Sequence, residues 1–108
     1  MNATIQTYLQ ETLGVAPKVR AWPSADKLPY FLRDAFDVRE LKLLDRIFLL
    51  AIDRQPQKLS LINVRGQVDK LRQLAEMPVI YVTRALASYE RKRLIEQKVP
   101  FIVPGNQL

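Results

Sequence analysis

Three short apolar runs, separated by helix-forming segments, are the feature that most constrains the fold of this chain. The runs are Ile47 to Ile52, Pro78 to Thr83 and Pro100 to Val103. A strand that is apolar on every side is typical of a sheet covered on both faces. The intervals hold a segment of helical spacing from about Ser60 to Glu76, and a helix from Ser88, its expected cap, to about Lys98. This order predicts parallel strands joined by right-handed helical crossovers.

The longer of the two predicted helices carries an apolar stripe and ends before Pro78. Gly66 lies inside it and is expected to weaken the helix slightly without breaking it. The residues of the stripe, which should face the sheet, are Leu61, Val64, Val68, Leu71 and Leu74.

A β-hairpin is predicted to extend the sheet on its N-terminal side. Apolar and charged residues alternate imperfectly from Val38 to Leu43, and Leu44 to Arg46 can turn the chain into the strand at Ile47 to Ile52. A single long helix from Val38 to Ala51 is the competing prediction. The hairpin is preferred because the run from Ile47 to Ile52 is apolar on every side.

Three shorter elements are predicted before the hairpin. Thr4 to Leu13 has the spacing of a short amphipathic helix, and Lys18 to Trp22 reads as a strand near a sheet edge. Leu28 to Phe36 concentrates bulky apolar residues, and Pro29 suits the first turn of a short helix.

These elements predict one α/β domain over residues 1–108. The sheet is three-layer-like, with βαβ units in the C-terminal half, the hairpin extending the sheet and helices on its faces. Hydrophobic residues make up 48% of the chain and charged residues 26%, which is the balance of a globular domain rather than a disordered one.

The composition excludes several kinds of chemistry. The chain has no cysteine and no histidine, so it lacks a thiolate nucleophile, a cysteine zinc site and the usual acid/base group at neutral pH. A metal site would have to be built from carboxylates. We expect no catalytic residue, no metal and no cofactor. The absence of a secretory signal pattern and of a membrane-spanning apolar run predicts a cytoplasmic location.

The net charge of +6 makes attraction to a polyanion such as nucleic acid a reasonable expectation. The candidate phosphate contacts are Arg91, Lys92, Arg93 and Lys98. A solvated helix face is the alternative interpretation, because three consecutive positions point in different directions around a helix.

One triplet resembles part of a nuclease site. Glu40-Leu41-Lys42 lies on a predicted strand and is preceded by Asp34 and Asp37, which resembles the ExK arm of a restriction-type nuclease, where carboxylates hold magnesium. That arrangement needs an acidic residue on a separate preceding strand, whereas both aspartates lie in or beside a predicted helix-turn segment. Alternating charge on a half-exposed strand explains the same residues.

The C-terminal part of the chain resembles a known group of proteins. Ser88-Tyr89-Glu90-Arg91-Lys92-Arg93-Leu94-Ile95-Glu96, followed by Val99-Pro100-Phe101-Ile102-Val103-Pro104-Gly105-Asn106-Gln107-Leu108, is similar to the N-terminal domain of bacterial MarR-like winged-helix transcriptional regulators. Leu28-Pro29-Tyr30-Phe31-Leu32-Arg33-Asp34 is similar to an earlier segment of that group. The resemblance covers most of the chain from about Leu28.

The resemblance implies a non-catalytic sensing or oligomerisation domain of a transcriptional regulator. The winged helix that contacts DNA is expected to follow residue 108, so the chain would be the N-terminal part of a longer protein. A homodimer is a further expectation, and a membrane partner is not expected. The alternative function is a restriction-nuclease-like or other magnesium-dependent domain acting on nucleic acid.

Overall fold

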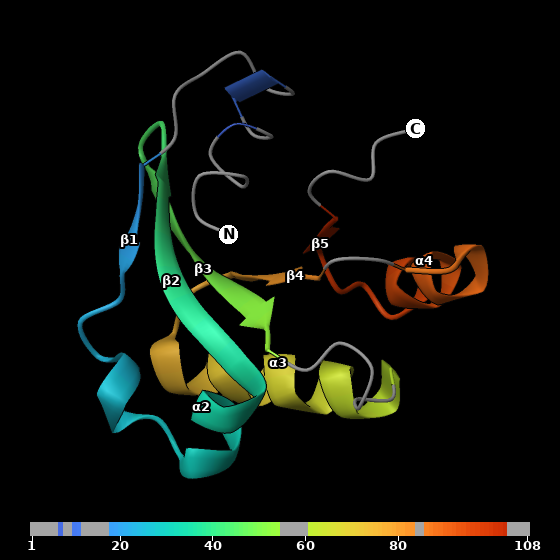
Figure 1. Cartoon of the computed structure of the whole chain (residues 1–108), viewed down its shortest axis with the longest axis horizontal. Coiled ribbons are helices and arrows are strands. Elements are labelled where there is room, and N and C mark those ends of the chain that lie inside the picture. Colours follow the sequence, from blue (N-terminus) through green and yellow to red (C-terminus); the bar gives the residue numbers. More distant parts are fainter. Residues whose placement is uncertain (1–6, 8–9, 12–17, 55–60, 84–85, 104–108) are drawn as a thin grey trace.

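The computed structural model describes residues 7, 10–11, 18–54, 61–83 and 86–103. In this part of the chain five strands form one sheet, and helices pack beside it (Figure 1). The strands are β1 (Lys18–Ala21), β2 (Phe36–Leu43), β3 (Arg46–Asp53), β4 (Val79–Val82) and β5 (Phe101–Ile102). The helices are α2 (Tyr30–Ala35), α3 (Leu61–Ala75) and α4 (Ser88–Glu96), with a short 3-10 turn η1 (Ala25–Lys27) before α2.

The strands follow one another across the sheet in chain order, and the pairing changes from antiparallel to parallel at β3. β1 and β2 pair antiparallel, and so do β2 and β3. β4 pairs parallel with β3, and β5 pairs parallel with β4, through crossovers that contain α3 and α4. The predicted α/β fold, the parallel C-terminal half and the extending hairpin are therefore confirmed.

The hairpin prediction is confirmed, and the competing long helix from Val38 to Ala51 is wrong. β2 begins two residues earlier than predicted, and its first residue Phe36 lies opposite Asp53 at the end of β3. A two-residue turn of Leu44 and Asp45 joins the strands. Leu44 has φ 57°, a left-handed conformation that a bulky residue seldom adopts, and its side chain is 73% exposed.

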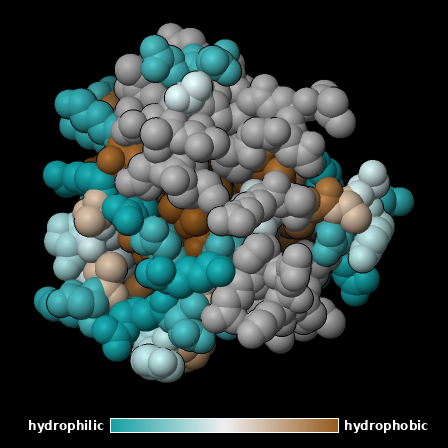
Figure 2. Space-filling view, in the orientation of Figure 1, coloured by the Kyte–Doolittle hydropathy of each residue, from teal (hydrophilic) through white to brown (hydrophobic). Residues whose placement is uncertain are grey.

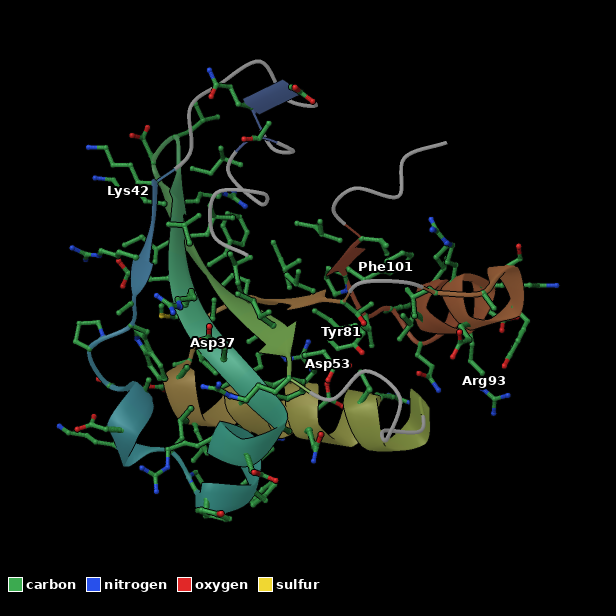
Figure 3. All side chains as sticks on the ribbon, viewed as in Figure 1. Asp37, Lys42, Asp53, Tyr81, Arg93 and Phe101 are labelled. Carbon is green, nitrogen blue, oxygen red and sulfur yellow. The ribbon has the colours of Figure 1, made fainter. Side chains whose placement is uncertain are left out.

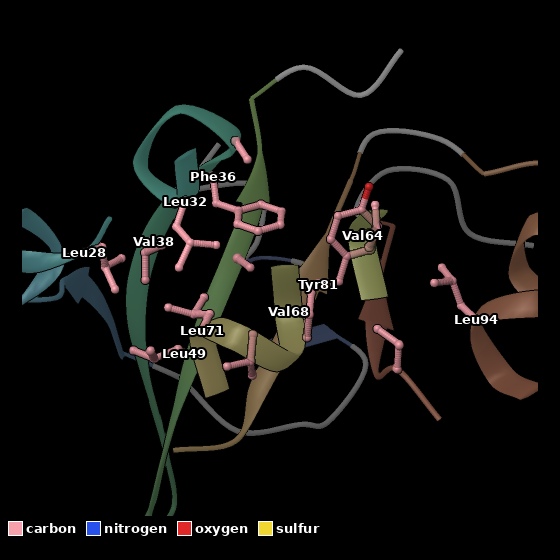
Figure 4. Close-up of a cluster of buried hydrophobic side chains, with 14 residues drawn as sticks. Leu28, Leu32, Phe36, Val38, Leu49, Val64, Val68, Leu71, Tyr81 and Leu94 are labelled. Carbon is pink, nitrogen blue, oxygen red and sulfur yellow. The ribbon is translucent and has the colours of Figure 1, made fainter. Parts of the chain in front are cut away.

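The two faces of the sheet bury separate apolar clusters, because successive side chains of a strand point to opposite faces. On one face, α2, α3 and α4 contribute to a cluster around Phe36, Leu49 and Tyr81 (Figure 4). On the other face, Leu41, Leu50, Ile52, Val82 and Ile102 form the second cluster. Within the described ranges, helical residues join only the first cluster.

The predicted stripe of α3 is confirmed at three positions and wrong at its last position, and the burial of its first residue, Leu61, lies outside what the structure describes. Val64, Val68 and Leu71 are buried in the first cluster, whereas Leu74 is 48% exposed. At the end of the helix, Ala75 is the residue that packs against the cluster instead. Gly66 is accommodated inside the helix, as predicted.

The start of α4 differs from the prediction. Ser88 is the first helical residue rather than the cap, which is Ala87. The Glu90 carboxylate accepts a hydrogen bond of 2.8 Å from the backbone N–H of Ala87, so the acidic side chain three residues into the helix secures the start that Ser88 was expected to cap. At the other end, Lys98 has φ 60°, and the N–H of Val99 donates to the carbonyl of Leu94.

One prediction falls mostly on residues that the structure does not describe, namely the helix expected over 4–13. Among the helices of the described ranges, none has the length and apolar character that crossing a membrane requires.

Candidate functional site

Two of the three buried polar residues of the described ranges, Asp53 and Thr83, lie at one end of the sheet, and the third, Glu40, lies midway along β2. The carboxyl ends of the parallel strands β3, β4 and β5 point to this end, and so does the N-terminal end of the antiparallel strand β2. Ligands of open α/β sheets bind outside the carboxyl ends of the strands. This end of the sheet is therefore the candidate functional site.

Asp53 and Tyr81 form the buried polar pair of this end (Figure 3). Asp53 is the last residue of β3, and Tyr81 lies on the neighbouring strand β4. The Tyr81 hydroxyl donates a hydrogen bond of 2.7 Å to Oδ2 of Asp53. The ring of Tyr81 also meets Phe36 edge-on, with centroids 6.3 Å apart. Thr83, immediately after β4, is buried as well.

Burial is the main reason that the pKa of Tyr81 lies well above its ordinary value, and the hydrogen bond to Asp53 acts in the same direction. A phenol in this environment holds its proton and acts as a hydrogen-bond donor at neutral pH. The pair is suited to fixing the position of the Asp53 carboxylate rather than to abstracting a proton.

The raised pKa predicts a loss of stability in alkali. Because the folded protein holds the Tyr81 proton more tightly than the unfolded chain, this contribution is complete below about pH 10 and declines as the pH rises above it. Between pH 9 and 11 the loss of this contribution should lower the free energy of unfolding by about 1 kcal/mol. Urea titrations across that range, with Tyr81→Phe as the reference, would measure it. Equal losses in the two proteins would contradict the prediction.

Asp37 is held by arginines at the same end of the sheet. Nε of Arg39 donates to its two carboxylate oxygens at 3.1 and 3.2 Å, and Nη2 of Arg54 lies 3.9 Å from Oδ1. Nε of Arg54 in turn donates to the carbonyl of Arg33 at 3.1 Å. Asp37 is the second residue of β2 and follows the end of α2 by two residues, which agrees with the expectation that it lies in or beside a helix-turn segment.

The two aspartates lie on opposite faces of the sheet. Asp53 pairs with Phe36 and shares its face, whereas Asp37 pairs with Ile52 and shares the face of the second cluster. Two carboxylates separated in this way do not converge on one ion. Among the residues that the structure describes, no group of three or more acidic side chains is placed to hold a metal.

The fold separates Glu40 and Lys42 from the two aspartates that precede them. Glu40 is buried, and its Oε1 accepts a hydrogen bond of 2.7 Å from Nε of Arg20 on β1. Lys42 is exposed near the far end of β2, away from Asp37 (Figure 3). Asp34 lies on α2. Glu40 is thus an ion-pair partner, and the expectation of a half-exposed strand is wrong at this residue.

A small surface pocket adjoins the group formed by Asp37, Arg39 and Arg54. It has a volume of about 280 Å³ and lies between η1, α2 and β2. Its lining combines the apolar residues Leu28, Phe36 and Val38 with charged side chains at Arg33, Asp37 and Arg54. This volume is just under the range of pockets that hold drug-sized ligands, roughly 300–1,000 Å³, so it would suit a smaller molecule.

The predicted phosphate contacts are placed on or just after α4. Lys92, Arg93 and Lys98 are exposed, whereas Arg91 is half-buried and its Nε donates to the carbonyl of Leu86 at 3.4 Å. Glu90 and Glu96 lie on the same helix. The four cations therefore do not form one uninterrupted basic face, and their role in binding stays a prediction.

The fold and the site define an α/β domain with a hydrogen-bonded Asp–Tyr pair and an arginine-held aspartate at the carboxyl end of its sheet. No family model, no curated protein and no solved structure matches the chain significantly.

Proposed function

We propose that this chain is a non-catalytic sensing or oligomerisation domain of a bacterial MarR-like transcriptional regulator. The proposal starts from the sequence similarity over Leu28 to Asp34 and Ser88 to Leu108. In such a regulator a winged helix elsewhere in the protein would read the DNA sequence, and this domain would control it.

The observation that carries the non-catalytic part is that three strand carboxylates, two of them buried, are each hydrogen-bonded to a side chain of the fold. Glu40 is bonded to Arg20, Asp37 to Arg39, and Asp53 accepts the Tyr81 hydroxyl. Carboxylates that are charge-paired or hydrogen-bonded in this way stabilise the fold and are poor ligands for an added metal ion. The pocket beside Asp37 supports the sensing form of the proposal, because a regulator that senses a ligand needs a site of this kind.

A reporter assay would test the regulatory role. The chain is fused to a DNA-binding domain that represses only as a dimer, and repression is measured with and without candidate small ligands. Repression by the fusion supports oligomerisation, and repression that a ligand alters supports sensing. The matched control is a fusion in which Leu71→Ala destabilises the domain. A fusion that neither represses nor responds to any ligand argues against the proposal.

A magnesium-dependent domain acting on nucleic acid is the alternative function. Asp37 and Asp53 lie on adjacent strands at the same end of the sheet, but on opposite faces, which is unfavourable for this alternative. Incubation of the chain with plasmid and single-stranded DNA in magnesium separates the candidates. We expect no cleavage. Cleavage that requires magnesium and is lost in Asp37→Asn and Asp53→Asn would favour the enzyme, and its loss in Glu40→Ala would implicate the ExK triplet instead.

A further inference from the structure

The end of the sheet at the turn of Leu44 and Asp45, which we call the hairpin end, carries an unusual pair of like charges. Lys18 of β1 lies directly opposite Lys42 of β2 in the antiparallel ladder, and both side chains are exposed. Like charges in directly opposite positions destabilise a sheet. Folding alone gives no reason to place two lysines there.

The next residue pair on the same face of this ladder, two positions along, shows a neutral arrangement of charges. Arg20 lies opposite Glu40, with the two side chains 2.7 Å apart, and both point to the same face as the lysine pair. The same pair of strands thus carries a matched pair of charges and, one step further out, an unmatched pair. A bound anion would attract both lysines and so offset the repulsion between them.

A third cation completes this end of the sheet. Arg46, the first residue of β3, is exposed and lies opposite Leu43, so its side chain is at the same end of the sheet as the two lysines but on the other face. Asp45 in the turn offsets part of the charge, which leaves the surface of Lys18, Lys42 and Arg46 net basic. Figure 2 shows hydrophilic residues along the side of the molecule where β1 and the hairpin end lie.

The hairpin end also presents apolar side chains to solvent. Leu44 and Ile47 are 73% and 43% exposed, and Leu44 is held in its left-handed conformation at the tip. A two-stranded β-ribbon has the dimensions to enter a groove of duplex DNA, and ribbon or arm proteins that bind DNA use apolar residues between the bases beside cations on the phosphates.

We infer that the hairpin end is a contact surface for duplex DNA, with Lys18, Lys42 and Arg46 on the phosphates. This surface lies apart from α4, which the sequence had suggested for that role (Figure 1). Binding through it is sequence-independent, because phosphate contacts alone carry no base information. The inference does not depend on the proposed regulatory role, and the test below measures the binding of this chain by itself.

Two triple variants of equal charge change test the inference. In one, Lys18→Gln, Lys42→Gln and Arg46→Gln are combined; in the other, Lys92→Gln, Arg93→Gln and Lys98→Gln are combined. Fluorescence anisotropy with labelled duplexes of differing sequence is recorded between about 50 and 200 mM salt, where phosphate contacts dominate the salt dependence. Circular dichroism confirms that both variants fold.

The hairpin variant should bind at least about tenfold more weakly at the lowest salt, and its salt slope should flatten by up to about 2.7, since each phosphate contact contributes about 0.9. The α4 variant should stay within about twofold of the natural protein, because the inferred contacts remain intact. An equal or larger loss in the α4 variant overturns the inference, as does an unchanged hairpin variant. Binding to vesicles rich in phosphatidylserine without binding to DNA also overturns it, and assigns the surface to lipid headgroups.

Discussion

Leu71→Ala is expected to lower the free energy of unfolding by about 3 kcal/mol. Leu71 is fully buried at the centre of the first cluster, where α3 meets the sheet. Truncation removes three carbon atoms, Cγ and the two Cδ methyl groups, from an interior that is packed as closely as an organic crystal, so the cost includes the cavity as well as the lost transfer energy. Urea titration followed by circular dichroism would measure the change.

Leu74→Ala is the matched control for this change, because it makes the same truncation on the same helix. Leu74 is 48% exposed, so its removal should cost no more than about 0.5 kcal/mol. The sequence places both leucines on one stripe, and the structure separates them. Similar costs at the two positions would show that α3 is rotated relative to the packing described above.

Tyr81→Phe is expected to cost about 2 kcal/mol, within the range for removing one partner of a buried polar pair. The change keeps the ring that meets Phe36 and removes only the hydroxyl that donates to Asp53. The buried carboxylate therefore loses one hydrogen-bond donor without a change in packing. The measurement is again the free energy of unfolding in urea, at neutral pH.

Tyr89→Phe serves as the control, since it removes the same hydroxyl from a side chain that is 73% exposed on α4. Its expected effect is within about 0.5 kcal/mol of zero. If Tyr81→Phe were equally silent, the Asp53–Tyr81 pair would contribute nothing to the fold, and its place at the carboxyl end of the sheet would need a functional explanation.

The fold was predictable from the sequence because its strongest signals are independent of tertiary context. β3 and β4 each contain an apolar run, a pattern typical of a strand buried on both faces. The helical spacing of apolar residues in α3 is typical of a helix buried on one face. The exposure of Leu74 was not predictable, because the stripe turns slowly around a helix and only the neighbouring element decides where it leaves the interface. The start of α4 differs from the prediction for a local reason. The sequence predicts Ser88 as the cap only because serine is common at that position, whereas the side chain of Glu90 secures the start of the helix at Ala87.

The site could be predicted only in part. The sequence predicts Asp37 and Glu40 only as carboxylates near a lysine. The arginine partner of Glu40, Arg20, comes from the neighbouring strand and is set by register, whereas Arg39 lies two residues after Asp37 on the same strand. The Asp53–Tyr81 pair escaped notice because each residue ends or interrupts an apolar run and has no motif of its own. Its one sequence signal is that two polar groups fall near the ends of consecutive buried strands, which parallel pairing brings to the same end.

The position of β3 between an antiparallel neighbour and a parallel one has a kinetic consequence. The β2–β3 hairpin closes over a two-residue turn, so its ladder can form within microseconds, whereas the parallel partner β4 must wait until the chain has passed through α3. We therefore expect the free edge of β3 to act as the template on which the C-terminal half assembles. The rate of folding would accordingly respond most to changes in the hairpin, and the rate of unfolding to changes in β5 and α4.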